Sequence, residues 1–419
     1  MIDIKILRED PSKMKERIAR KGANPDLVDK ILEADSKRCE SLAELEDAQS
    51  KLNKFSKEIA ELHGQQKIDS IKEAGNYSTK VSELKPRVAG LEEEFKSNLL
   101  LIPNPPSDDV IDGASDKDNT TNRTWGEPTK FDFESLDYLE LAKKHDLLDI
   151  ERGVKVAGSR SYYVKRELAL LEFAIIQYAL ETLTAEGFVP MITPVLLNRK
   201  IMEGSGYIPQ GEDEIYKTQD DTYLAGTAEQ PLAGYHMDDI IMEKALPLRY
   251  VGFSSCFRRE AGSYGKDVKG ILRVHQFDKV EMFSYTMPEE SAKEHEYLVS
   301  LEEKLMQGLK IPYQVVNICA GDLGAPAAKK FDIEAWMPSE NKYRETHSCS
   351  NCTDFQARRL NIRFKNKEDK IEYAHTLNGT AFAIPRLLIA ILENFQQKDG
   401  SIEIPEVLHK YLNFKKIGK

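Results

Sequence analysis

Residues 254–285 read SSCFRREAGSYGKDVKGILRVHQFDKVEMFSY, and this stretch decides the fold that the sequence predicts. The stretch is interpreted as two strands that flank a loop rich in glycine and lysine. Because side chains alternate between the faces of a strand, one face of this pair should gather charged and aromatic groups. They are Arg258 and Glu260 on the first strand, and His275, Phe277, Lys279 and Glu281 on the second.

The residue types on this face are suited to a ligand that carries both phosphate and ammonium groups. An arginine can bind a phosphate through its bidentate fork, a phenylalanine ring can stack on a base, and a carboxylate can pair with an ammonium. The ordinary alternative is a solvated sheet face whose charges form salt bridges, which would explain any one of these residues. Their crowding on one face favours a binding site over that alternative.

The sequence upstream of this pair extends it into a larger domain. Residues 166–188 predict an amphipathic helix, and residues 189–197, VPMITPVLL, predict a strand. Pro194 interrupts the hydrogen-bond ladder of that strand, as in an edge strand or a subunit contact. We therefore expect residues 131–419 to form an α+β domain with flanking helices on an antiparallel sheet.

Downstream, residues 375–396 read HTLNGTAFAIPRLLIAILENFQ. The pattern predicts a polar strand end that turns through Asn378 and Gly379 into an apolar helix. Pro385 would lie in the first turn of that helix, where a missing N–H costs nothing. Arg386 would then stand near the positive end of the helix dipole, a place suited to polyanions.

Residues 1–102 predict a different architecture, a long helical hairpin. Apolar residues follow a 3,4 rhythm in two runs, separated by the polar stretch HGQQKIDSIKEAGN at 63–76. The runs are Leu42, Leu45, Leu52, Phe55, Ile59, Leu62 and then Tyr77, Val81, Leu84, Val88, Leu91, Phe95, Leu99, Ile102. Two antiparallel helices of about 35 residues, each about 50 Å long, would form a coiled-coil arm. Pro86 should kink the second helix, and the prolines of IPNPPSDD (102–109) should end it.

Composition limits the classes of protein that fit. Residues 103–130 are polar and poor in aliphatic side chains, which predicts a linker. The formal net charge of −11 over 419 residues excludes global attraction to nucleic acid, so any such binding needs a local basic surface. The five cysteines are scattered, and no apolar run approaches the ~20 residues of a membrane span. Together with an amino end that lacks a signal peptide, these features predict a cytosolic protein with free thiols and no membrane partner.

The stretch ETHSCSNCTDFQ at 345–356 suggests a metal or redox site at first sight. A single Cys-x-x-Cys pair is half of a tetrahedral zinc site, and no second pair follows, so no structural zinc is expected. A thioredoxin-like reading lacks the helix start that such a motif needs. Cys349 and Cys352 are therefore interpreted as small packing residues.

Taken together, these segments resemble the bacterial type of seryl-tRNA synthetase, a class II aminoacyl-tRNA synthetase, over nearly the whole chain. The resemblance is carried by FRRE at 257–260, GTAEQPL at 226–232, LRVHQFDKVE at 272–281, SCSNCTDFQARR at 348–359, and the turn into Ala383-Ile384-Pro385-Arg386. The helical arm and its IPN junction agree with the same family. Three motifs, an arm and a junction together are far more specific than any one motif.

The resemblance implies which residues bind the amino acid. In the family, serine is held by the Thr-Ala-Glu motif, the motif 2 arginine, the glutamate on the second motif 2 strand and a hydroxyl in the motif 3 turn. The implied serine-binding residues are Thr227, Ala228, Glu229, Arg258, Glu281 and Thr380. Among the residues implied at the site, Arg258, Glu281 and Arg386 are expected to act on the reacting groups. Thr380 stands where many members have serine, and it keeps the hydroxyl.

The resemblance also implies sites for ATP and Mg²⁺. The implied ATP-binding residues are Arg258, Arg259, Glu260, Val274, His275, Gln276, Phe277, Glu345, Thr346, His347, Ser348 and Arg386. Glu345 and Ser348 are the implied Mg²⁺ ligands. Strict alternation would place these two on opposite faces, so both can reach one ion only if the strand bulges or ends between them.

Several interpretations of function remain open at this point. By heptads alone the arm could equally be a spacer or a dimerisation coil. The resemblance instead implies that it binds the long variable arm of serine tRNA, and that of selenocysteine tRNA, through lysines such as Lys51, Lys54, Lys57, Lys72 and Lys80. It also implies that the enzyme is a homodimer. A catalytically silent relative, a ligase that charges a carrier protein, and a plain α+β protein with a coiled coil are the alternatives.

Overall fold

The computed structural model of the chain describes residues 1–261 and 269–418, and the chain divides into two compact units. One unit is Ile2–Pro103, and the other begins at Asn104 and includes Met1. Residues 262–268, part of the glycine- and lysine-rich loop of the opening stretch, lie outside the described residues.

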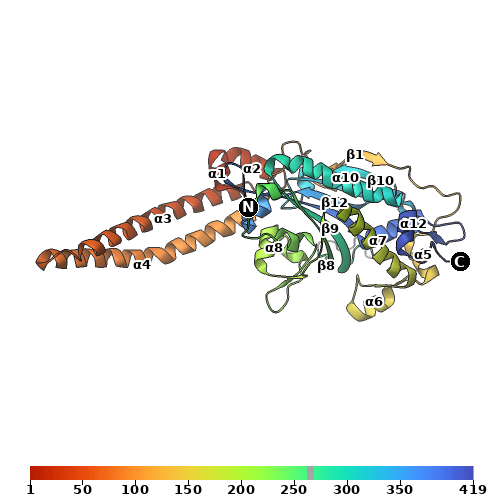
Figure 1. Ribbon diagram of the computed structural model, residues 1–419, viewed down its shortest axis with the longest axis horizontal. Helices are drawn as coiled ribbons and strands as arrows, with labels where there is room; N and C mark the ends of the chain where they lie inside the picture. The colour runs from red at the N-terminus through yellow and green to blue at the C-terminus, as the bar shows by residue number, and fades with distance from the viewer. Residues whose placement is uncertain (262–268, 419) are drawn as a thin grey trace. The chain divides into compact units, whose positions relative to one another are not determined.

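The first unit is helical, and its two long helices form the predicted hairpin (Figure 1). Its helices are α1 (Ile4–Glu9), α2 (Pro11–Ala19), α3 (Asp26–Glu58) and α4 (Gly64–Leu101). Ala48 of α3 is buried with Val81 and Leu84 of α4. The rings of Phe55 and Tyr77 stack across the pair with their centroids 5.8 Å apart. The apolar seam read from the sequence therefore joins the two helices as predicted.

The polar stretch 63–76 is not the turn that the sequence predicts, because α4 begins at its second residue, Gly64. The chain reverses between Glu58 and Gly64, and Gly64 has a φ of 61°, which other residues rarely adopt. Apolar periodicity does not identify this part of the helix, because its two isoleucines are exposed and belong to neither apolar run. Pro86 lies inside α4 as predicted, and the helix ends at Leu101, next to the proline-rich junction.

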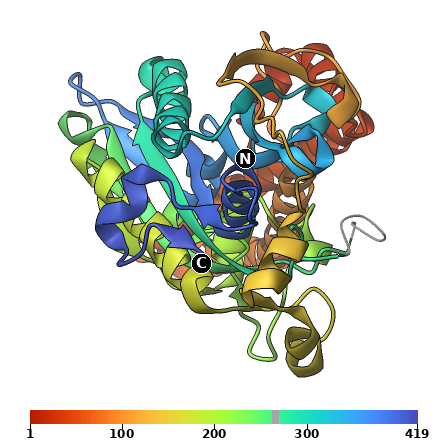
Figure 2. The same cartoon turned by 90° about the vertical axis from the view of Figure 1, so that its right-hand side faces the viewer.

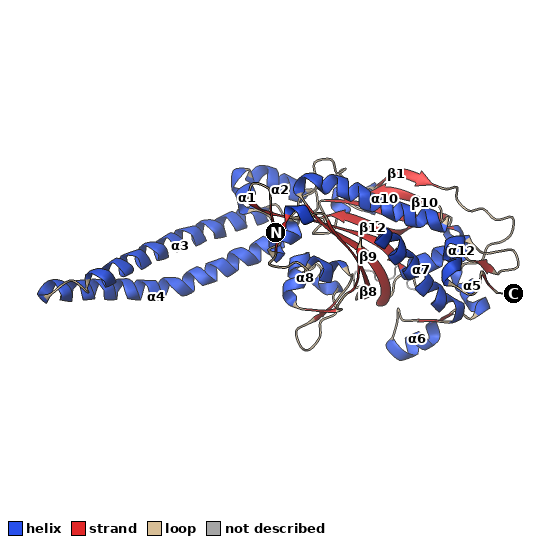
Figure 3. Cartoon of the chain, in the orientation of Figure 1, coloured by secondary structure: helices blue, strands red, loops and turns tan. Residues whose placement is uncertain are grey.

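The second unit is built around an eight-stranded sheet in the order β1-β10-β11-β12-β15-β9-β8-β4 (Figure 3). Neighbouring strands are antiparallel except β4 and β8, which are parallel. The strands are β1 (Thr120–Trp125), β4 (Val189–Ile192), β8 (Leu248–Phe257), β9 (Gln276–Thr286), β10 (Tyr313–Asn317), β11 (Lys329–Met337), β12 (Lys342–Asn351) and β15 (His375–Ala383). The predicted α+β class is confirmed.

Shorter elements surround this sheet. Among the described residues, the remaining strands form four small sheets. One has three strands, β14 (Ile371–Tyr373), β13 (Arg363–Lys365) and β7 (Ile240–Met242). The other three are pairs: β16 (Ile402–Glu403) with β17 (Lys416–Ile417), β2 (Leu148–Asp149) with β3 (Tyr163–Val164), and β5 (Leu196–Leu197) with β6 (Tyr223–Leu224). The helices are α5 (Tyr138–His145), α6 (Ile150–Ala157), α7 (Arg166–Ala185), α8 (Arg199–Ser205), α9 (Glu229–Ala233), α10 (Ser291–Leu309), α11 (Phe355–Leu360) and α12 (Ile384–Asn394).

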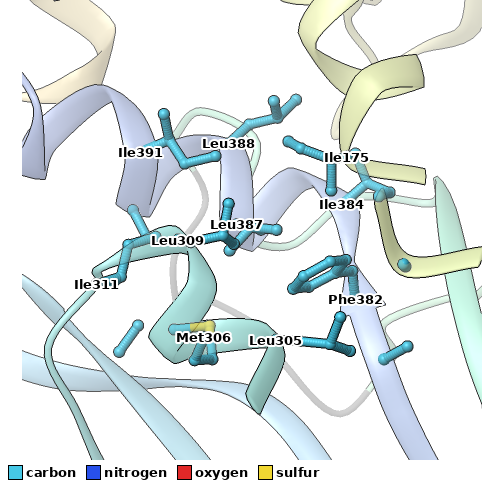
Figure 4. Packing of buried hydrophobic residues seen from close by; sticks show 14 of the residues in the cluster. Ile175, Leu305, Met306, Leu309, Ile311, Phe382, Ile384, Leu387, Leu388 and Ile391 are labelled. Atoms are coloured by element: carbon cyan, nitrogen blue, oxygen red, sulfur yellow. The ribbon is translucent and has the colours of Figure 1, made fainter. Parts of the chain in front are cut away.

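The main core lies where α7, α10 and α12 pack together against the sheet (Figure 2). Leu305 and Leu309 of α10 lie close to Leu387 of α12 and to Phe382 of β15 (Figure 4). Each such buried side chain contributes about 1.5–3 kcal/mol through removal of apolar surface from water. Among the described residues, α7 is the one helix long and apolar enough to cross a membrane, and its Ile175 belongs to this core.

The two ends of the sheet differ in how far the sequence predicted them. β4 is an edge strand that ends at Ile192, just before Pro194, as the proline predicts. At the opposite edge, β1 arises from residues 103–130, which the sequence predicts to be a linker. Its run TTNRTW is rich in β-branched and aromatic side chains, and Trp125 stacks on Tyr313 of β10 at 5.8 Å. The polar composition hid this strand because most of its side chains are exposed.

Two strand ends near the opening stretch also differ from the prediction. β8 ends at Phe257, so Arg258 and Glu260 lie beyond the strand, and Glu260 has a φ of 52°. β15 does not turn at Asn378 and Gly379, as predicted, but continues to Ala383. Pairing on both sides with β9 and β12 keeps those two residues extended despite their turn chemistry. Helix α12 follows directly, with its proline in the first turn as predicted.

Candidate active site

A cavity of about 680 Å³ lies in the second unit, lined by side chains of β9, β12 and β15 and by the loops around them. This volume is in the range of small-molecule sites. The residues predicted for the site that line this cavity are Glu229, Arg258, Glu260, Val274, Phe277, Glu281, Glu345, Thr346, Ser348, Thr380 and Arg386. The cavity therefore brings together segments more than 150 residues apart in the sequence.

One wall of the cavity carries a buried ion pair. Lys279 Nζ lies 2.5 Å from Glu281 Oε2 and also donates to Thr227 Oγ1 at 3.3 Å. Thr380 Oγ1 donates to Glu281 Oε2 at 3.5 Å, from a point where β15 bulges by one residue, Ala381, relative to β9. Burial raises the pKa of Glu281 to about 7, although Lys279 opposes the shift. Its carboxyl therefore changes charge near neutral pH.

A second carboxylate of the cavity, Glu229, stands at the start of α9 and is 6% exposed. The Tyr207 hydroxyl donates to its Oε2 at 2.9 Å, and Gln356 Nε2 donates to its Oε1 at 2.9 Å. Burial raises the pKa of Glu229, while Tyr207, Lys279 and Gln356 lower it. With two carboxylates in one wall, the cavity is suited to a ligand that carries an ammonium group.

Arg258 lies over the ring of Phe277, with its guanidinium carbon 5.3 Å from the ring centroid. Its Nε donates to the carbonyl of Gly226 at 3.2 Å, and its backbone N–H donates to His275 O at 2.9 Å. These contacts leave the guanidinium on the cavity wall, where a phosphate could accept from it. The ring of Phe277 on the same wall could stack on a base.

Glu345 and Ser348 both line the cavity because β12 bulges between them, as predicted. Glu345 pairs with Glu334 of β11 and His347 with the preceding residue, Ile333, so Thr346 is the extra residue. Glu345 Oε1 lies 3.2 Å from Arg386 Nη1, at the start of α12. Burial raises the pKa of this carboxyl, but Arg386 and two further cations lower it to about 2.

A Mg²⁺ ion fits this part of the cavity. Mg²⁺ prefers oxygen ligands and is usually held by one or two carboxylates together with substrate phosphates. The bulge presents an ionised carboxylate and a hydroxyl, Glu345 and Ser348, to the same space.

Cys349 and Cys352 are both buried, and in the described part of the chain no three His, Cys, Asp or Glu side chains are grouped as metal ligands.

Six residues predicted for the site do not line the cavity among the described residues: Thr227, Ala228, Arg259, His275, Gln276 and His347. Thr227 and Ala228 are buried behind it, and Gln276 is exposed at the start of β9. His275 Nδ1 lies 3.0 Å from the carbonyl oxygen of Arg258, which makes it a support for that loop. Arg259 donates its backbone N–H to Glu214 O.

His347 lies on the other side of β12 from the cavity. Its ring packs against Phe382 at 5.7 Å, and its Nδ1 lies 2.8 Å from Thr346 Oγ1. Burial lowers the pKa of His347 to about 3, so the ring is neutral at physiological pH. The bulge that brings Ser348 into the cavity is also what turns this histidine away from it.

Motif reasoning missed Tyr207, Lys330 and Asn378 as cavity residues. Tyr207 lies after α8 in a loop without a recognisable pattern, and Lys330 lies near the start of β11, far along the chain from the motifs. Asn378 was interpreted as a turn residue. The alternation of β15, in which Asn378 and Thr380 share a face, was the one signal that could have identified it.

Comparison with known proteins identifies the family of the chain. Residues 1–106 match the family model for the seryl-tRNA synthetase N-terminal domain, and residues 214–395 match that for the tRNA synthetase class II core domain (G, H, P, S and T). The serine–tRNA ligase of Dictyoglomus turgidum is 50% identical over 421 aligned positions, covering 100% of this chain and 99% of its own length.

Solved structures give the same result. The seryl-tRNA synthetase from Pyrococcus horikoshii, complexed with ATP, superposes with a TM-score of 0.93 at 42% identity and covers 100% of this chain and 99% of its own. The cytoplasmic serine–tRNA ligase of Naegleria fowleri, in complex with AMP, has a TM-score of 0.88 at 35% identity, with coverages of 100% and 98%. Sequence and fold agree with these relatives over the full length, and the chain therefore belongs to the seryl-tRNA synthetase family of class II serine–tRNA ligases.

Proposed function

We propose that the cavity activates L-serine with ATP and that the enzyme passes the seryl group to serine tRNA. In the first step an oxygen of the serine carboxylate attacks the α-phosphorus of ATP. The bond from that phosphorus to the β-phosphate bridging oxygen breaks, giving seryl-adenylate and pyrophosphate. In the second step the 3′-hydroxyl of the terminal tRNA ribose attacks the seryl carbonyl carbon, AMP leaves, and the hydroxyl proton is released.

The observation that carries this proposal is that one cavity is lined both by the carboxylates of Glu229 and Glu281 and by the guanidinium groups of Arg258 and Arg386. Glu229 and Glu281 would receive the ammonium of serine, while Arg258 and Arg386 would neutralise charge on the phosphates. Phe277 would stack on adenine. Serine's carboxylate is already a nucleophile, so the first step needs positioning and charge stabilisation and no general base. Glu345 and Ser348 would hold Mg²⁺, which supplies further charge neutralisation when bound.

Serine-dependent exchange of labelled pyrophosphate into ATP tests the first step directly. With Mg²⁺ present, exchange should be fastest with serine and much slower with alanine. Alanine lacks the hydroxyl group and would leave the buried group that binds it in the cavity without a hydrogen-bond partner. Pure enzyme that exchanges no pyrophosphate with any of the standard amino acids would refute the proposal. A charging assay that compares serine tRNA with a carrier protein as the acceptor then distinguishes this function from that of a carrier-protein ligase.

The charge of Glu281 predicts a pH dependence for serine use. Since the pKa of Glu281 is about 7, its carboxyl becomes protonated as the pH falls below 7 and can no longer pair with an ammonium. We expect kcat/KM for serine to fall with a slope that approaches about tenfold per pH unit on the acid side. The variant Glu281→Gln should be slow and should lose this acid limb. A profile that stays flat from pH 8 to pH 5.5 in the unmodified enzyme would contradict the assignment.

The hairpin offers a basic groove for tRNA. Lys54 and Lys57 of α3 and Lys85 of α4 line it. Replacing all three with alanine should raise KM for serine tRNA by about tenfold or more and make binding less salt-dependent, because each phosphate contact releases counterions. Pyrophosphate exchange should not change. Lys37→Ala is the matched control, since Lys37 of the same helix pairs with Glu33 at 2.7 Å and is not among the lysines of the groove. The same assay with selenocysteine tRNA tests whether that tRNA is also charged.

The exposed apolar face beside the edge strand supports a homodimer. Phe173 of α7 and Ile192 of β4 are 68% and 88% exposed, which is unusual for large apolar side chains on a soluble protein. A second copy of the chain would cover them in the proposed assembly. Sedimentation should give twice the chain mass, and Ile192→Asp should shift the equilibrium towards the monomer. We also propose a cytosolic location, because the chain belongs to the seryl-tRNA synthetase family.

A further inference from the structure

The amide of Gln356 connects the Glu229 carboxylate to elements outside the cavity. Gln356 is the second residue of α11 and is fully buried behind the cavity wall. Its Nε2 donates to Glu229 Oε1 at 2.9 Å and to the carbonyl of Ser205, the last residue of α8, at 3.0 Å. Its Oε1 accepts from Thr376 Oγ1 of β15 at 2.8 Å. One side chain therefore joins α8, α11 and β15 to the carboxylate at the start of α9.

These contacts fix which way the amide points. Both partners of Nε2 are acceptors only, a carboxylate and a carbonyl, whereas the partner of Oε1 is a hydroxyl that can donate. Turning the amide around would place its oxygen against two other oxygens. The three hydrogen bonds of the Gln356 amide can therefore form in only one of its two orientations.

The second oxygen of Glu229 accepts from Tyr207, which lines the cavity. A buried carboxylate with a neutral donor on each oxygen keeps its position and remains available to a charged ligand on its cavity side. Losing the inner donor would leave an oxygen buried without a partner, and the carboxylate would turn or take up a proton. Nothing in the reaction itself requires Gln356 to touch a substrate.

We propose that Gln356 is a positioning residue for amino-acid binding, which fixes the Glu229 carboxylate in the orientation that receives the polar groups of serine. This inference rests on the proposed function, because it takes the cavity to bind an amino acid. Gln356 acts through Glu229 and not on ATP. Its loss should therefore affect the two substrates differently.

The variant Gln356→Met removes the amide while nearly conserving volume. We expect kcat/KM for serine in pyrophosphate exchange to fall by about 10- to 100-fold, the scale of losing a hydrogen bond to a charged group, with KM for ATP unchanged.

A matched control is Gln396→Met. Gln396 is an equally buried amide, 1% exposed, whose Nε2 donates to the carbonyls of Leu136 and Glu393 away from the cavity. Gln396→Met should lower Tm without changing kcat/KM for serine. Thr376→Val, which removes the hydroxyl that orients Gln356, should cause a smaller loss in the same direction, and it carries the test if Gln356→Met does not fold.

The outcomes separate the two proposals. If the unmodified enzyme shows no serine-dependent exchange, the proposed function fails and no conclusion on Gln356 is needed. If it is active, and Gln356→Met or Thr376→Val changes the serine and ATP parameters equally, the positioning role is refuted.

Discussion

Replacing Arg258 with glutamine is expected to lower the rate of serine-dependent pyrophosphate exchange by about 1,000-fold, the scale of removing an arginine from a phosphoryl-transfer site. The guanidinium lies on the cavity wall over Phe277, and under the proposed function it binds the α-phosphate and stabilises the charge that develops there. Lysine would keep the charge but not the fork, so Arg258→Lys should recover only part of the rate. The measurement is exchange at saturating serine and ATP.

A matched control for this variant lies on the same strand region. Arg249 of β8 is a partly buried arginine that makes two hydrogen bonds of 2.7 Å to Glu294, away from the cavity. Arg249→Gln should lower Tm, since it leaves the buried Glu294 carboxylate without its charged partner, but exchange per folded molecule should stay near that of the unmodified enzyme. If Arg258→Gln proved no slower than Arg249→Gln, the phosphate assignment would be wrong.

Glu345→Gln is expected to reduce exchange by about 100-fold and to raise the Mg²⁺ concentration needed for half-maximal rate. The amide keeps the shape of the side chain but loses the charge that both a hard cation and Arg386 require. Because the pKa of Glu345 is about 2, the carboxylate is fully ionised at working pH, and the variant therefore removes a whole charge. The experiment is a Mg²⁺ titration of exchange at fixed ATP.

Glu334 provides the comparison, since it pairs with Glu345 across the two strands but does not line the cavity among the described residues. Gln314 donates to its Oε2 at 2.6 Å. Glu334→Gln should leave the Mg²⁺ titration unchanged. An identical Mg²⁺ requirement in the Glu345 and Glu334 variants would show that neither carboxylate reaches the metal, and would redirect the search to other oxygen ligands of the cavity.

How much of the site the sequence could predict depended on where strand periodicity holds. Phe277, Lys279 and Glu281 were placed on one face by alternation, and all three line the cavity because β9 is regular there. Alternation also placed Arg258 on this face, and it lines the cavity although its strand ends one residue earlier, at Phe257. At the bulge in β12, alternation predicted only that some irregularity must exist, and it could not tell which neighbouring side chain would turn away.

One error comes from tertiary pairing that overrides local preference. Asn378 and Gly379 have turn chemistry, yet strands on both sides keep them extended. The helix at 64–76 has no apolar seam, so only the continuity of α4 makes it visible. Gln356 could not have been singled out at all, because its role depends on Ser205 and Thr376, which no local pattern connects to it.

The ion pair between Lys279 and Glu281 means that the amino-acid pocket carries its own ammonium group before a substrate arrives. Under the proposed function, serine does not meet a bare carboxylate but exchanges with this internal competitor. The free energy of binding is then the difference between two similar ion pairs in one low-dielectric wall, and not the full strength of either. Such a pocket can discriminate by the shape and hydrogen bonding of the side chain while it releases the aminoacyl product readily, as turnover requires.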